Sequence, residues 1–295
     1  MTVDPGAIAV AKGATQVALY GGALGVIGAG TCRRVVFPRV GTPLHGADRA
    51  AADVAAASAM LLLAAVALRL YVQVIDSYLT LVPTPQMLRM LIFSTRAWGI
   101  GLLAQLCLGA ALVMLTRAAR PGRRGAGALA TWAGIVAAAT VPLTGHAAAH
   151  GGPAGIAAQA LHVLALGAWL GALAVLLRTT APVPVDALAA GVRAFSPVAR
   201  VAAPTMALAG VAALLSHVGT DGLVGSPYGS VLAGKAVLFA AAASLGYVNW
   251  TRRTPLLVDD AGRRRFIATA RVELGLAAVA LVITAVLTAM GRPGD

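Results

Sequence analysis

The sequence predicts an all-α membrane protein, a polytopic transmembrane bundle of about eight helices with both termini on the outer face. Of its 295 residues, 59% are apolar and only 11% are charged, too few to keep the surface of a soluble domain solvated. Apolar runs long enough to cross roughly 30 Å of hydrocarbon as helices, about 20 residues each, recur along the chain. These runs are apolar on every face, whereas strands of a membrane barrel alternate apolar and polar residues.

Eight apolar runs are expected to span the membrane, and prolines or glycines punctuate the joints between them. The runs cover residues 13–31, 51–72, 97–116, 128–148, 155–177, 201–218, 230–250 and 272–290. No joint is long enough to form a soluble domain. The whole chain, 1–295, is therefore expected to be a single integral membrane domain.

The distribution of basic residues predicts the orientation of the bundle. The joints after the first, third, fifth and seventh runs hold 17 of the 23 lysines and arginines. Because cytoplasmic loops are enriched in these residues, the odd joints are expected in the cytoplasm and both termini outside. This arrangement requires an even number of spans, which supports eight.

The formal charge of +13 does not indicate a nucleic-acid-binding protein, because the basic residues lie in short joints and form no aromatic-interleaved patch. The first 16 residues contain Asp4 and no basic leader, so we expect no cleaved signal peptide. Cys32 and Cys107 are expected at different membrane depths, which argues against a disulfide between them.

Four of the five histidines, His146, His150, His162 and His217, are expected near the outer ends of the fourth, fifth and sixth spans. In a continuous helix His146 and His150 would share one face, at a spacing that allows two imidazoles to bind one metal ion. Burying an imidazole among alanines and leucines is costly unless the ring is paired or ligated. We expect at least two of the four to form a functional site, and His146 and His162 to share it. The alternative is that these rings are solvated at the membrane interface.

Three other charged residues are predicted at or within the spans. Lys235 either snorkels to the outer surface or acts electrostatically beside the histidines. Asp53 and Glu273 are expected at the cytoplasmic ends of the second and eighth spans, where they would cap helices or else line a cytoplasmic exit.

Methionines are possible soft ligands for Cu(I). Met87, Met90 and Met290 are expected on the outer side and are the candidate accessory ligands. Met60, Met114 and Met206 are expected deeper, where a single thioether is more often a packing group.

Six segments between residues 131 and 290 resemble the copper resistance protein D family of bacterial inner-membrane proteins in their order and spacing. They are TGHA at 144–147, LHVLALGAWLGALAVLL at 161–177, RAFSPVA at 193–199, SPYGSVLAGKAVLF at 226–239, LGYVNWTRR at 245–253 and RVELGLAAVALVITAVL at 271–287. The resemblance implies copper handling at the cytoplasmic membrane, with His146 and His162 as site residues and Lys235 as a structural or electrostatic member. It also implies a periplasmic copper-binding partner, which would act in trans because the outer tails are too short for such a domain.

The leading hypothesis is therefore a multi-pass copper permease or copper delivery protein of the inner membrane, which captures Cu(I) or Cu(II) on outer histidines. No enzymatic activity is expected, and no G-x-x-x-x-G-K-[ST] loop for ATP is present. One alternative is a haem protein of membrane electron transfer, with histidines from neighbouring helices as axial ligands. Another is an assembly factor that delivers copper to a respiratory oxidase without net transport.

Overall fold

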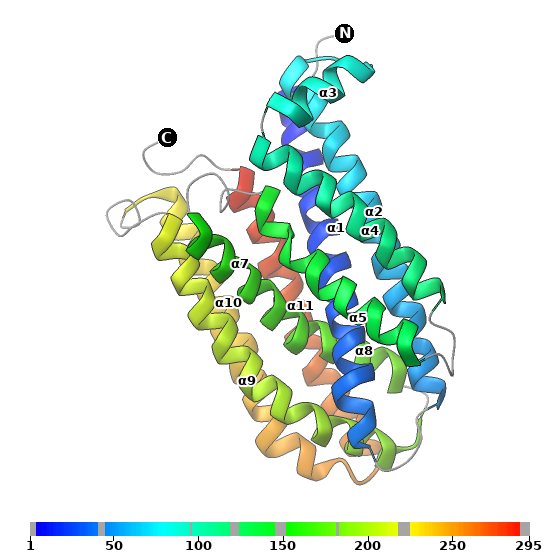
Figure 1. Ribbon diagram of the computed structural model, residues 1–295. Helices are drawn as coiled ribbons and strands as arrows, with labels where there is room; N and C mark the ends of the chain where they lie inside the picture. Colours follow the sequence, from blue (N-terminus) through cyan, green and yellow to red (C-terminus); the bar gives the residue numbers. More distant parts are fainter. Residues whose placement is uncertain are drawn as a thin grey trace.

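The computed structural model describes residues 4–40, 45–94, 96–118, 124–144, 152–180, 183–217 and 225–289, and these residues contain helices and no strands (Figure 1). The α-helices are α1 (Pro5–Thr31), α2 (His45–Tyr78), α3 (Pro85–Ser94), α4 (Arg96–Ala118), α5 (Arg124–Ala139), α7 (Gly152–Leu166), α8 (Ala172–Thr180), α9 (Val185–His217), α10 (Pro227–Val248) and α11 (Asp260–Ala289). The π-helical segments are η1 (Cys32–Val36), η4 (Gly167–Gly171) and η5 (Asn249–Arg253). The 3₁₀ segments are η2 (Phe37–Arg39), η3 (Val141–Thr144) and η6 (Thr254–Leu256).

The predicted polytopic all-α bundle is confirmed. Within the described residues, six helical stretches are long and apolar enough to cross a membrane, and they overlap the second, third and fifth to eighth predicted spans over most of their length. The first predicted span lies in α1, which has the length to cross but is not among those six. The described part of the fourth lies in α5 and η3, where 131–144 forms a shorter apolar helix.

Several helices extend beyond the apolar runs. Helix α9 begins at Val185 and α11 at Asp260, so basic residues expected in joints, among them Arg193 and Arg264, lie on helices. The joint between the second and third spans contains a further helix, α3. Hydropathy marks where a helix meets hydrocarbon, whereas Arg and Glu continue a helix readily into water.

The capping interpretation of Asp53 and Glu273 is wrong. Helix α2 begins eight residues before Asp53, and its first turn contains Asp48 instead. Glu273 lies nearly four turns into α11 and is only 2% exposed.

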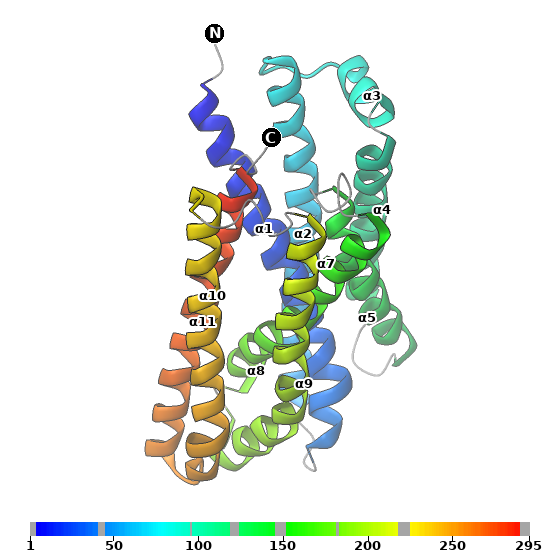
Figure 2. The same cartoon turned by 90° about the vertical axis from the view of Figure 1, so that its left-hand side faces the viewer.

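Helix α1 runs through the bundle and contacts α2, α5, η4, α8 and α11 (Figures 1 and 2). Lys12 and Asp76 join α1 to α2 near the start of α1, at 2.6 Å. At the other end of the pair, Arg33 and Asp48 join η1 to α2 at 2.8 Å. The start of α1 and the end of α11 lie at the same end of the bundle, as an even number of crossings requires (Figure 1).

Close helix contact at the centre depends on glycine. A Cβ atom at Gly28 of α1 would lie 2.2 Å from the backbone carbon of Gly171 in η4. A Cβ atom at Gly171 would in turn lie 2.3 Å from the Leu24 carbonyl oxygen. Small residues at such crossings let membrane helices approach closely. Cys32 and Cys107 are both free, as predicted.

Candidate functional site

A large cavity of about 930 Å³ lies among α1, α7, α8, α9, α10 and α11. Most of its lining is leucine, valine, alanine and glycine. The polar or charged side chains among its described lining residues are Tyr20, Gln159, His162, Trp169, Arg178, Lys235 and Thr284. The large cavity thus brings a predicted histidine and the predicted lysine to one place.

His162 lies in the wall of the large cavity, on α7. Its Nδ1 atom is 2.8 Å from the backbone oxygen of Met206 on α9. A carbonyl oxygen only accepts hydrogen bonds, so Nδ1 must carry the proton. In the neutral ring, Nε2 then has a free lone pair, which is the arrangement of a metal-binding histidine whose other nitrogen is held by a carbonyl.

Two residues of α9 complete the surroundings of the imidazole. Met206 is 7% exposed and lines the same cavity as His162. Gly210 leaves room for the ring, because a Cβ atom there would be 2.9 Å from Nδ1 of His162. Met206 belongs to the hydrophobic core, as expected of a packing residue, and it also lines the cavity that contains His162.

Lys235 of α10 also lines the large cavity. It has no hydrogen bond or ion pair with any described residue, and it lines the same cavity as His162. Because the side chain lines the cavity, the electrostatic role is favoured over snorkelling away from the bundle.

A polar network anchors the segment that leads to His146. Arg69 of α2 donates to the Thr144 hydroxyl at 2.8 Å and to its backbone oxygen at 2.7 Å. Gln105 of α4 donates to the Thr140 carbonyl at 2.7 Å and to the Thr144 hydroxyl at 3.1 Å. Thr144 begins the TGHA segment, so Arg69 and Gln105 hold the chain two residues before His146.

The structure brings together only part of the predicted site. His146, His150 and Met290 lie outside the described residues, as does the side chain of His217, the last residue of α9. Met87 and Met90 lie on α3, which packs on α2 and α4, and neither lines the large cavity. Among the described residues, no group of three or more His, Cys, Asp or Glu could hold a metal ion.

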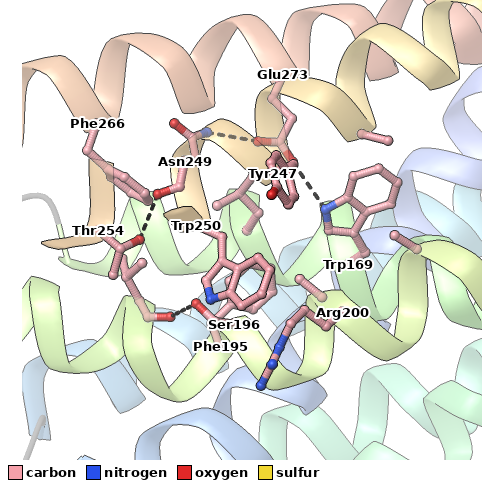
Figure 3. A pocket seen from close by; sticks show the side chains of 16 residues that line it. Trp169, Phe195, Ser196, Arg200, Tyr247, Asn249, Trp250, Thr254, Phe266 and Glu273 are labelled. Carbon is pink, nitrogen blue, oxygen red and sulfur yellow. Dashed lines mark hydrogen bonds between the residues drawn. The ribbon is translucent and has the colours of Figure 1, made fainter. Parts of the chain in front are cut away.

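A small cavity of about 210 Å³ is lined by residues of η4, α8, α9, α10, η5, η6 and α11 (Figure 3). The Glu273 carboxylate accepts a hydrogen bond from Nε1 of Trp169 at 3.1 Å and another from Nδ2 of Asn249 at 3.0 Å. Figure 3 shows the two donors approaching the carboxylate from different sides. Both donors lie in π-helical segments, which are frequent at functional sites.

Trp169 separates the two cavities, because it lines both of them. Its indole is 3% exposed and packs edge-on against Phe239, with the ring centroids 6.1 Å apart. On the far side of the small cavity, the Arg200 guanidinium lies 4.9 Å from the ring centroid of Trp250. Glu273 was foreseen only as a possible lining residue of a cytoplasmic exit, whereas its partners Trp169 and Asn249 were missed.

A comparison with known protein families finds a match for the C-terminal third of the chain. Residues 189–287 match the family described as Copper resistance protein D. No curated protein and no solved structure matches the chain. The matched segment contains Met206, Gly210, Lys235, Asn249 and Glu273, whereas His146 and His162 precede it.

Proposed function

We propose, from the match of residues 189–287 to the copper resistance protein D family, that the protein binds copper ions in the large cavity and passes them toward the cytoplasm. The family match supports a role in copper resistance for this multi-pass membrane protein. Binding at His162 and passage across the membrane are the finer parts of the proposal.

The observation that carries the proposal is the hydrogen bonding of the His162 ring. Its Nδ1 atom is hydrogen bonded to the Met206 carbonyl, which leaves Nε2 free to bind a ligand, and His162 lines a cavity within the membrane-spanning region. Imidazole binds copper in both oxidation states, and the neighbouring Met206 thioether favours Cu(I). In this proposal His146 or His150, or His217, completes the coordination, and the hydrogen bonds of Arg69 and Gln105 hold Thr144, two residues before His146.

In this proposal, copper passes from the large cavity to the small cavity on its way to the cytoplasm. Trp169 stands between the cavities, and the Glu273 carboxylate lies directly behind it. A buried carboxylate attracts a cation in a low-dielectric environment. We therefore place Glu273 on the path by which copper leaves His162 for the cytoplasm. Copper would reach the outer side on a periplasmic copper-binding protein acting in trans.

The test is copper binding by purified His162→Ala, with His45→Ala as the matched control. His45 is the first residue of α2, at the end of the bundle opposite the start of α1. In competition with a Cu(I) chelator, we expect His162→Ala to bind copper more than tenfold more weakly and His45→Ala to match the wild type. The double variant His146→Ala/His162→Ala should be little worse than either single variant, because ligands of one ion act as a unit. Unchanged copper stoichiometry in His162→Ala would overturn the assignment.

The volume of the large cavity favours haem as a second candidate, since about 930 Å³ greatly exceeds what a single metal ion fills. His162 would then be an axial ligand. An absorption spectrum of the purified protein separates the candidates, because a haem protein is strongly coloured and a copper carrier is nearly colourless. Copper uptake into vesicles that contain the protein separates transport from delivery to an oxidase: net uptake supports transport.

A further inference from the structure

The large cavity is oversized and apolar for an ion-binding site. Its volume of about 930 Å³ equals the liquid volume of roughly thirty water molecules. Beyond its few polar groups, the lining consists of aliphatic side chains such as Leu214, Leu232, Ala236 and Leu281. An apolar cavity of this size is filled more favourably by hydrocarbon than by water.

The charges on its lining all have one sign. Lys235 and Arg178 are the charged residues among the described lining residues, and neither Asp nor Glu is present there. Lys235 has no hydrogen-bonding or ionic partner among the described residues. An ammonium group held among aliphatic side chains is costly unless an anion offsets its charge.

Two helices that line the cavity leave it a side facing the bilayer. Helix α9 packs on α7 and α10 packs on α11, while contact between α9 and α10 is at most marginal. Each of the two helices turns one stripe into the cavity: Met206, Gly210 and Leu214 on α9, and Leu232, Lys235, Ala236 and Phe239 on α10. Figure 2 shows α9 standing apart from the α10 and α11 pair. The cavity is therefore lined by two helices that do not pack closely on each other.

We propose that the large cavity binds an anionic amphiphile from the bilayer, whose head pairs with Lys235 and whose hydrocarbon chain lies against the aliphatic wall. The shared chemistry is an acyl chain with an anionic head, supplied by a free fatty acid or an anionic phospholipid. This site does not depend on copper binding. It is compatible with it, because an anion beside Lys235 reduces the repulsion that a copper ion would meet at His162.

The test is native mass spectrometry of the copper-free protein after exposure to oleate, phosphatidylglycerol or phosphatidylcholine. The variants are Lys235→Met, Lys235→Arg and, as the matched control, Lys12→Met, which removes a lysine paired with Asp76 outside the cavity. We expect one anionic ligand retained by the wild type, Lys235→Arg and Lys12→Met, and at least tenfold weaker retention by Lys235→Met. Retention of oleate alone identifies a fatty-acid site, and retention of phosphatidylglycerol alone a phospholipid site.

Equal retention of phosphatidylcholine, or undiminished retention by Lys235→Met, would overturn the proposal, and so would a haem absorption band. If Lys235→Met does not fold, fluorescence of the wild type provides the test. Dibrominated stearate should quench Trp169, which lines the cavity, more strongly than its uncharged methyl ester. The difference should shrink in Trp169→Phe. Equal quenching by the acid and the ester would reject the site, whatever the outcome of the copper measurements.

Discussion

His162 owes its orientation to a backbone carbonyl on a neighbouring helix. The contact between Nδ1 and the Met206 oxygen determines which nitrogen is protonated, and it also determines which nitrogen remains for a ligand. Gly210 makes this contact possible, since its missing side chain provides the space beside the ring. A metal-binding role for His162 therefore depends on a residue that carries no chemistry of its own.

Gly210→Ala should weaken copper binding by about tenfold, which corresponds to about 1.4 kcal/mol. The added Cβ would lie 2.9 Å from Nδ1 of His162 and would displace the ring from the Met206 carbonyl. Gly234→Ala is the matched control, because a Cβ at Gly234 meets nothing within 4 Å. Chelator competition on the two purified variants measures the difference. Equal copper affinities would show that the position of this ring does not matter.

Glu273 illustrates a different way to hold a polar group in the spans. Its carboxylate has a neutral donor for each oxygen, Trp169 for one and Asn249 for the other. Asn249 is itself held by Thr254, whose hydroxyl donates to its backbone oxygen at 2.9 Å. Hydrogen bonds to a buried carboxylate offset part of its desolvation cost. Trp169 is thereby fixed between the two cavities.

At the level of helices, the π-helical segments and the glycine crossing determine where these side chains lie. A π-helical turn inserts an extra residue and so shifts the facing of the residues that follow it. Segment η4 carries Trp169 and crosses α1 at Gly171, and η5 carries Asn249. The crossing between Gly28 and Gly171 thus sets the position of the partition between the cavities.

Overpacking a core usually costs about 1–3 kcal/mol. Gly28→Ala should lower the free energy of unfolding by more than this range. Its Cβ would lie 2.2 Å from the backbone of Gly171, and backbone cannot rotate away as a side chain can. Gly275→Ala in α11 is the control, since a Cβ there has no neighbour within 4 Å. Thermal unfolding in detergent, followed by fluorescence, compares the two variants. Similar melting temperatures would mean that α1 and η4 separate easily.

At the scale of the whole molecule, the apolar runs were sufficient to predict the class and six of the eight spans. They did not predict where α9 and α11 begin, because helices continue through charged residues beyond the hydrocarbon. The site was predictable only in part. His162 and Lys235 stand out as polar residues in apolar runs, but the pairing of Trp169 with Glu273 joins residues 104 positions apart. Such contacts depend on how helices pack, which periodicity does not specify.

The orientation of the bundle is the last prediction, and it concerns the entire chain. The start of α1 and the end of α11 lie at one end of the bundle, so the first and last described helices meet the same side of the membrane there (Figure 1). The opposite end carries η1, the end of α8 and η5, with their arginines, and 17 of the 23 basic residues follow odd-numbered spans. Because such residues remain in the cytoplasm, both termini should lie outside.

Alkaline phosphatase, which is active only outside the cytoplasm, should therefore be active when fused at Asp295 and inactive when fused near Gly122. Green fluorescent protein should give the reverse pattern at the same two positions. A third fusion at Thr84, between α2 and α3, serves as the control and should behave like the one at Asp295. A cytoplasmic terminus at Asp295 would contradict the eight-span topology, and it would place His162 and Lys235 nearer the cytoplasmic side, reversing the direction of the proposed copper route.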